Sequence, residues 1–245
     1  LRSSAVKKPI LILGNLYSKR DLIICFKNDL MPTISSIREC LICNNIGKHF
    51  GLKFSLHLKV DTGMSRLGFE INKFVQQFAK IKSFENISIE GIYSHLSSAD
   101  EHNSLDPKSR TQLQRQKFQE LLNQINVDRN YKIKIHLANS AGMLLTKDFH
   151  FDMVRVGLSM YGYSPIVKLD KNLSLKPALF LKVKVAFIRI IDEGVSVSYG
   201  GKFVSSRKTK LAVLSIGYAD GVPRNLSGKI HVIHNKKLYP QVGSI

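Results

Sequence analysis

The alternation of strand-like and helix-like segments constrains the fold of this chain more than any other feature of its sequence. Up to residue 175, short apolar runs alternate with stretches of helical period. We expect strands at 9–13, 22–26, 32–34, 54–60, 87–95, 132–137 and 153–156, and helices at 36–50, 73–81, 107–125 and from Ala138. Because each helix carries the chain back to the same end of the sheet, such strands pair in parallel. The pattern predicts an α/β fold with crossover helices.

The pattern changes after Pro177. Short strand-like runs follow at 179–191, 195–197, 211–214, 229–234 and 238–242, with glycines and no helical period between them. This predicts a second, mostly β domain. We therefore expect domains at 1–175 and 176–245. The absence of an initiator methionine, and an end directly after a strand-like run at Ile245, favour a fragment of a longer protein.

The composition indicates a soluble globular protein, with 44% hydrophobic and 22% charged residues. No run approaches the roughly 18 apolar residues of a membrane helix, and the N-terminus lacks the apolar core of a signal peptide. The cysteines Cys25, Cys40 and Cys43 are too few for a disulfide framework and fit a reducing compartment. We therefore expect a cytoplasmic protein without a membrane partner.

Two of the cysteines have the spacing of a metal or redox motif, in Cys40-Leu41-Ile42-Cys43. A structural zinc ion needs further thiolate or imidazole ligands, and the sequence has no second cysteine pair. On the helix expected after Ser36, this spacing places two small apolar side chains on one face. We interpret the pair as core packing and expect no metal.

The net charge of +19 raises the question of a nucleic-acid partner. The 37 lysines and arginines are scattered along the chain, however, and the densest runs, at 7–8, 207–210 and 236–237, are short. No zinc-finger spacing, RNP-like aromatic motif or long basic arm accompanies them. We interpret the charge as solvated surface and predict no nucleic-acid partner.

Polar and charged residues gather where the expected strand 54–60 ends. Asp61, Thr62 and Gly63 bring an acid, a hydroxyl and a conformationally permissive glycine, and Arg66 adds a planar fork of donors. In barrels of parallel strands, the loops at the carboxyl ends of the strands form the active-site face. This loop is therefore a candidate functional site.

The segment 57–69 resembles the signature of alanine racemases, pyridoxal-phosphate (PLP) enzymes of fold type III. Further segments resemble the family in the same order, at 91–101, 136–141, 154–162, 197–200 and 216–221. The resemblance implies a (β/α)8 TIM-type barrel, here N-terminally incomplete, followed by a truncated, mostly β C-terminal domain. It also implies a homodimer that interconverts L-alanine and D-alanine with PLP, supplying D-alanine for peptidoglycan.

Racemisation requires that a proton leave one face of the α-carbon and return on the other, while PLP acts as electron sink. The family uses two acid/base groups for this, namely the lysine that holds PLP and a tyrosine of the partner subunit. The resemblance places that tyrosine at Tyr199. It places Tyr218 and Asp220 at the substrate entrance.

The resemblance also implies how the cofactor is held. Arg155 is expected at the pyridine nitrogen, where a permanently charged guanidinium discourages protonation of that nitrogen. His95 is expected to hydrogen-bond Arg155 and help orient it. Ser140 and the backbone donors of Gly157 and Leu158 correspond to the phosphate cup, since hydroxyl and main-chain N–H groups bind phosphate without side-chain charge.

Arg66 is expected at the phenolic oxygen of the cofactor and at the substrate carboxylate. Lys59 corresponds to a position that in many family members carries a carbamate, which neutralises and positions that arginine. The family's PLP lysine is expected upstream of Leu1, so we expect these 245 residues alone to be inactive. Ser244 stands where the family often has an arginine.

Two alternatives to a racemase remain at this point. A fold-type III amino-acid decarboxylase shares the barrel-plus-β architecture, but the segments around Tyr199 and Tyr218 argue against it. A non-catalytic PLP-binding protein would need only a lone barrel, and the β domain after Pro177 argues against that.

Overall fold

A computed structural model gives the structure of residues 1–16, 18–126, 133–166 and 173–245. The chain forms two compact units, Leu1–Ala178 and Leu179–Ile245, and each has its own sheets.

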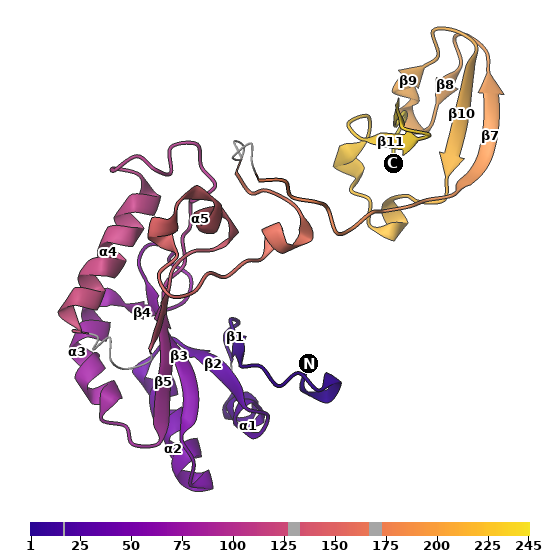
Figure 1. The fold of residues 1–245 in the computed structure, drawn as a ribbon. Helices are drawn as coiled ribbons and strands as arrows, with labels where there is room; N and C mark the ends of the chain where they lie inside the picture. The colour runs from indigo at the N-terminus through magenta and orange to yellow at the C-terminus, as the bar shows by residue number, and fades with distance from the viewer. Residues whose placement is uncertain (17, 127–132, 167–172) are drawn as a thin grey trace. The chain divides into compact units, whose positions relative to one another are not determined.

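Within the described residues, the first unit is built on a six-stranded sheet with the path β1-β2-β3-β5-β6 and β4 paired to β3 (Figure 1). Every pair in it is parallel, which confirms the expected α/β class. The strands are β1 (Ile10–Ile12), β2 (Leu30–Ile34), β3 (Phe54–Asp61), β4 (Phe69–Glu70), β5 (Ile87–Tyr93) and β6 (Lys134–His136). The helices are α1 (Lys19–Lys27), α2 (Ile37–Phe50), α3 (Ile71–Lys82), α4 (Arg110–Gln124) and α5 (Ser140–Leu145), with 3-10 turns η1 (Arg2–Ser4), η2 (Lys147–Phe149) and η3 (Leu158–Tyr161).

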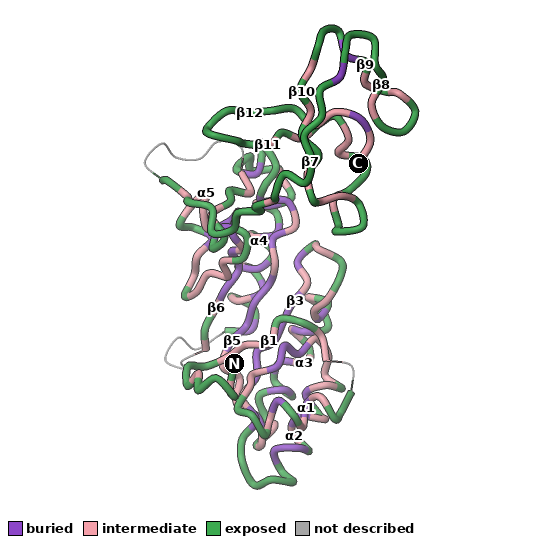
Figure 2. The backbone as a smooth tube through the Cα atoms, turned by 90° about the vertical axis from the view of Figure 1, so that its right-hand side faces the viewer, coloured by how far each residue is buried: buried purple, intermediate pink, exposed green. Residues whose placement is uncertain are grey.

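Helices α2, α3 and α4 lie along one side of the sheet (Figure 1). The central strand β3 is buried along almost its whole length, as expected for a parallel strand covered on both faces. Buried segments follow the strands of the sheet in Figure 2. Leu56, Leu58 and Val60 of β3 are fully buried, and each such side chain contributes roughly 1.5–3 kcal/mol to folding.

Side-chain caps fix where four helices begin. The side chain of the residue before each helix accepts a backbone N–H from its first turn, which satisfies a donor that the helix leaves unpaired. These caps are Ser18 for α1, Ser36 for α2, Ser109 for α4 and Asn139 for α5. The cap at Ser109 explains why α4 begins at Arg110, later than the helix expected from residue 107.

The strand expected at 22–26 is wrong, because these residues belong to helix α1. The apolar run resembles a strand, but Leu22 and Cys25 are buried one turn apart while Ile24 between them is 46% exposed. This is the burial pattern of a helix with one face on the core. The capping hydroxyl of Ser18, which accepts the N–H of Asp21, starts the helix before the apolar run.

The strand expected at 153–156 is also wrong, since this segment has no regular secondary structure. It runs beside β6 with isolated hydrogen bonds. The N–H of Asp152 donates to the carbonyl of Ile135, and the N–H of Arg155 donates to the carbonyl of Ala138. The side chain of Asp152 accepts the N–H of Ile135 at 2.8 Å, so a carboxylate takes the place of a backbone partner there. A ladder therefore does not form. The strand expected at 132–137 is observed as β6; residue 132 lies outside the described residues.

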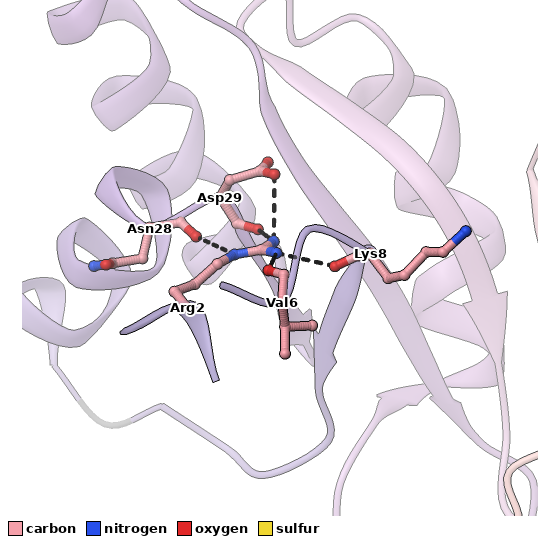
Figure 3. A network of polar contacts seen from close by, with 5 residues as sticks. All are labelled: Arg2, Val6, Lys8, Asn28 and Asp29. Atoms are coloured by element: carbon pink, nitrogen blue, oxygen red, sulfur yellow. Dashed lines mark hydrogen bonds and ion pairs between the residues drawn. The ribbon is translucent and has the colours of Figure 1, made fainter. Parts of the chain in front are cut away.

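Arg2 fixes the segment that leads into β1 (Figure 3). Its guanidinium donates to the carbonyls of Val6, Lys8, Asn28 and Asp29 at 2.6–3.0 Å. It also pairs with the Asp29 carboxylate at 3.3 Å. The planar fork of an arginine can satisfy several carbonyls at once, so this one side chain links the N-terminal segment to the turn between α1 and β2.

The second unit is mostly β, as expected. It contains the antiparallel pairs β7 (Val185–Ile191) with β10 (Thr209–Leu214), β8 (Ser196–Val197) with β9 (Phe203–Val204), and β11 (His231–His234) with β12 (Lys237–Pro240). Its 3-10 turns are η4 (Tyr199–Gly201), η5 (Tyr218–Asp220) and η6 (Arg224–Leu226). The strand expected at 179–191 begins only at Val185, because residues 179–184 have no partner strand among the described residues.

Membrane crossing by a helix finds no support in the described part of the chain, where no helix has the length and apolar character that a span requires.

Candidate active site

The carboxyl ends of three neighbouring strands bring three buried side chains together. Lys59 of β3 pairs in register with Tyr93 of β5, and Tyr93 pairs with His136 of β6. The Tyr93 and His136 rings are stacked with centroids 4.6 Å apart, and the Lys59 ammonium lies 5.7 Å from the centre of the Tyr93 ring. Thr33 of β2 lies 2.8 Å from the Tyr93 hydroxyl and donates its own proton to Ile12, so the Tyr93 hydroxyl is the donor to Thr33.

Arg155 lies over this cluster, with its guanidinium carbon 4.8 Å from the centre of the Tyr93 ring. It donates to the carbonyls of Ser94 at 2.7 Å and Leu137 at 3.0 Å. It also donates to Nδ1 of His136 at 2.7 Å and Nδ1 of His95 at 3.2 Å. The structure thus contains the contact between Arg155 and His95 expected from the sequence.

All of these acceptors are neutral. Within the described parts of the chain, Arg155 forms no ion pair with a carboxylate. Burial lowers the pKa of Arg155 to about 10, so the guanidinium stays charged at neutral pH. Burial, followed by the charge of Arg155, also lowers the pKa of His95 to about 4 and that of His136 to about 2. The site therefore combines one fixed cation with neutral imidazoles.

Lys59 is a buried lysine close to two other cations. Burial lowers its pKa, and the charges of Arg66 and Arg155 lower it further, while Asp61 acts in the opposite direction. A depressed pKa increases the fraction of neutral amine, which is the nucleophilic form. The arrangement is chemically suited to a lysine that reacts with carbon dioxide and exchanges a positive charge for a negative one.

Asp61 shapes the loop that carries Arg66. One oxygen of its carboxylate accepts the N–H groups of Gly63 at 2.8 Å and Met64 at 2.9 Å. The loop returns close to its own strand at Gly68, where φ is +132° and an added Cβ would lie 2.7 Å from the Asp61 nitrogen. Only glycine fits that position without moving the backbone. Arg66 itself is exposed.

Ser140 lies at the start of α5 and organises a small cup. Its hydroxyl oxygen accepts the N–H of Gly157 at 2.9 Å and that of Ser159 at 3.4 Å. Its own proton has no acceptor among the described residues, nor has the N–H of Leu158. The buried Ser159 hydroxyl also lacks a partner in this part of the chain. Ser140, Gly157 and Leu158 are thus brought together as the sequence predicts, and the cup holds several donors that need an acceptor.

Tyr199 and Tyr218 lie in the second unit and are highly exposed, at 82% and 66%. Tyr199 opens turn η4, and Ser244 holds this turn by donating its hydroxyl to the Tyr199 carbonyl at 3.3 Å. Ser244 thus has a structural role beside Tyr199, a role that the sequence did not indicate. The Asp220 carboxylate accepts the N–H of Gly217 at 2.9 Å, so it shapes turn η5 beside Tyr218.

Three residues of this site were missed from the sequence. His136 and Tyr93 lie within segments that resemble the family, and their position at strand ends was the available signal. Gln114 gave no signal, because it lies on α4 among polar residues. It is buried and donates to Thr62 at 3.3 Å and to the carbonyl of His95 at 2.9 Å. It therefore ties the loop after β3 to the loop after β5.

Cys40 and Cys43 are fully buried in the core, which confirms their interpretation as packing residues. Burial raises the pKa of the Cys40 thiol to about 12 and that of Cys43 as well. In the described residues, no group of three or more histidine, cysteine, aspartate or glutamate side chains is placed to hold a metal ion.

The fold and the site define a class of protein: a parallel barrel-type α/β unit that carries a donor-rich cup and a partly buried arginine at its strand ends, followed by a β unit. Comparison with known families specifies the class further. The family described as "Alanine racemase, N-terminal domain" matches residues 1–165, and "Alanine racemase, C-terminal domain" matches residues 178–245. The chain belongs to the alanine racemase family.

Individual relatives agree with this assignment. The chain is 47% identical over its whole length to an alanine racemase of Prochlorococcus marinus, of which it covers 63%. It superposes with a TM-score of 0.85 and 31% identity on 62% of an alanine racemase of Clostridium difficile. It also superposes on 65% of the Bartonella henselae alanine racemase with covalently bound pyridoxal phosphate, with a TM-score of 0.80 and 31% identity. The chain thus spans less than two thirds of these relatives.

Proposed function

We propose that the protein to which this chain belongs is a PLP-dependent racemase that interconverts L-alanine and D-alanine. The observation that carries the proposal is Arg155, a partly buried cation held by neutral acceptors between the ends of β5 and β6. An arginine in this setting suits contact with a ring nitrogen that must stay unprotonated, since it can only donate. Membership of the alanine racemase family supports the same activity.

The residues present fit the phosphate of PLP. The cup around Ser140 offers a hydroxyl proton, the Leu158 N–H and the orphaned Ser159 hydroxyl, and none of these has an acceptor in the described chain. A Cβ added at Gly157 would meet only the Ser140 hydroxyl, at 3.9 Å, so the space beside the cup is open. Donors of this kind are typical of phosphate sites built from backbone and hydroxyl groups.

When bound, PLP supplies an electron sink that stabilises negative charge at the substrate α-carbon. Arg155, which can only donate, would hold the ring nitrogen and discourage its protonation, so the sink would stay moderate. His95 orients Arg155 through the bond at 3.2 Å. Arg66 would hold the phenolic oxygen of the cofactor and the substrate carboxylate, and a carbamate on Lys59 would balance the charge of Arg66.

Proton movement at the α-carbon requires a group on each face. Tyr199 is the group for one face, and it acts in a homodimer on the site of the other subunit. Its high exposure in this single chain leaves the phenol free for that role. Tyr218 lies at the substrate entrance. The second group is the lysine that would hold PLP.

In this proposal residues 1–175 form the PLP-binding domain and 176–245 belong to the C-terminal β domain. The enzyme acts in the cytoplasm, where it supplies D-alanine for peptidoglycan. Neither an amino-acid decarboxylase nor a non-catalytic PLP-binding protein has a structural observation in its favour.

The test uses the complete protein, which contains this chain and its natural flanks. We expect a PLP-binding dimer that absorbs visible light and racemises alanine in both directions. Tyr199→Phe should lower the rate of racemisation in both directions by roughly a hundredfold or more, the usual contribution of a general acid or base, because the same phenol acts as base in one direction and as acid in the other. Tyr239→Phe is the matched control, because Tyr239 is another exposed tyrosine of the second unit. Full activity in Tyr199→Phe would remove this residue from the mechanism.

A further inference from the structure

A second histidine lies behind the histidine that contacts Arg155. Nε2 of His136 is 3.0 Å from Nδ1 of His57, and the two ring centroids are 5.2 Å apart. His57 comes from β3 and His136 from β6, on either side of β5. Three side chains therefore form a line, from the partly buried Arg155 through the buried His136 to the buried His57.

The arginine sets the direction of this line. A guanidinium has only donors, so Nδ1 of His136 must accept the bond from Arg155 at 2.7 Å. The ring proton of neutral His136 is then on Nε2, which donates to Nδ1 of His57. Nδ1 of His57 must therefore accept, and its proton is on Nε2. Protonation of the accepting nitrogen of either ring would place two donors face to face.

Burial favours the same neutral state. His57 is 3% exposed and His136 is fully buried. Desolvation lowers the pKa of His57 to about 4, although the carboxylate of Glu90 acts in the opposite direction. That carboxylate accepts the hydroxyls of Ser88 at 2.7 Å and Ser55 at 3.3 Å, and it forms no bond with His57 within the described residues.

The backbone provides a seat for the His57 ring. Gly91 of β5 is the register partner of His57, at the point where the register between β3 and β5 shifts. A Cβ at Gly91 would lie 2.3 Å from Nδ1 of His57 and 2.9 Å from the carbonyl of Lys134. No other residue type leaves room for the imidazole there. The contact with His136 thus depends on both the glycine and the histidine.

We propose that His57 is a positioning residue, which holds His136 in the tautomer whose Nδ1 accepts from Arg155 and so fixes the guanidinium in place. Without the acceptor at His57, the ring of His136 can turn over or take the other tautomer. Arg155 then loses its shortest bond to a side chain. This inference rests on the proposed function only for its effect on catalysis, because the tautomers are a property of the protein itself.

The first experiment reads the tautomers directly, by ¹⁵N NMR of histidine side chains in the complete protein at neutral pH. We expect His57 and His136 each to have an unprotonated Nδ1 and a protonated Nε2. His57→Phe keeps a planar ring but removes the acceptor, and the Nε2 proton of His136 should then exchange faster with water. A cationic His136, or a proton on its Nδ1, would overturn the proposal even if no variant folds.

The second experiment distinguishes the hydrogen bond that His57 accepts from the space that its ring fills. The side-chain oxygen of asparagine lies near the position of a histidine Nδ1 and can accept, so His57→Asn should restore the slow exchange of the His136 proton. With PLP bound, His57→Phe should lower kcat about tenfold with little change in KM, as expected for one lost hydrogen bond, and His57→Asn should recover most of it. Equal losses in both variants would refute the positioning role. Failure to bind PLP at all would refute the proposed function and leave the tautomer result standing.

Discussion

The buried histidines make the stability of this protein dependent on pH in a range where most side chains do not titrate. An ordinary histidine has a pKa near 6.5, whereas burial lowers the pKa to about 4 for His57 and to about 2 for His136. Below pH 6.5 the unfolded chain therefore binds protons that the folded chain does not. Their contribution to stability is present above about pH 6.5 and is lost as the pH falls toward the folded values.

The size of the effect follows from these pKa values. At pH 5 an unfolded histidine is almost fully protonated, and each of these two favours unfolding by about 2 kcal/mol relative to high pH. Between pH 6 and pH 5 alone, the pair should lower the free energy of unfolding by about 2.4 kcal/mol. The half-buried His95, whose pKa is lowered to about 4, acts in the same direction.

Urea unfolding of the complete protein at pH 7, 6 and 5 measures this effect. The chain has no tryptophan, but near-ultraviolet circular dichroism reports the Tyr93 ring stacked on His136. His57→Phe should remove about half of the pair's pH dependence, that is about 1.2 kcal/mol between pH 6 and 5. His102→Phe, at an exposed histidine of the same unit, is the matched control for the loss of a histidine. Equal stability at pH 7 and pH 5 would show that the folded protein protonates these rings and would refute the reasoning.

Three further predictions concern other parts of the chain. Arg2→Ala should lower the free energy of unfolding by about 2–3 kcal/mol. Arg2→Lys should recover less than half of this loss, because an ammonium cannot donate to the same set of carbonyls. Thermal unfolding of both variants tests this. The thiol of Cys40 should react with an aromatic disulfide reagent only at the rate of unfolding, and fast reaction under native conditions would contradict its burial. Gly68→Ala should destabilise the first unit by about 1–3 kcal/mol in a urea titration, since its Cβ would strike the Asp61 backbone; an unchanged midpoint would refute the close approach.

The sequence predicted those parts of the fold in which pattern and burial agree. Helix α2 follows from its period and the cap at Ser36, and β3 from the alternation of apolar and polar residues up to Val60. The residues of helix α1 were misread as a strand because their apolar run is compact. The polar residues on both sides of that run gave only a weak signal for a helix. The segment around Arg155 was misread as a strand. Its backbone pairing with β6 is interrupted where the Asp152 carboxylate accepts the N–H of Ile135, and hydrophobic periodicity does not reveal such a bond.

The same division holds for the site. The contacts of Arg155 with His95 and of Ser140 with Gly157 were expected from the resemblance to a family. Contacts that depend on strand register were not expected, such as the stacking of Tyr93 on His136. Register joins residues that are distant in sequence, and a single sequence does not state which strand positions lie opposite one another.

Register also explains how an arginine can stay partly buried here with no ion pair to a carboxylate in the described parts of the chain. Because β5 and β6 are parallel and in register, the carbonyls of Ser94 and Leu137 just beyond their ends both face Arg155 and accept from it. The other acceptors of the Arg155 N–H groups are the imidazoles of His136 and His95, and their own burial keeps these rings neutral. A carboxylate in their place would neutralise Arg155 and, if close enough, draw its donors away from a ligand. Neutral acceptors hold the guanidinium in position while its charge remains available to the ligand, which is the property that the proposed function requires of Arg155.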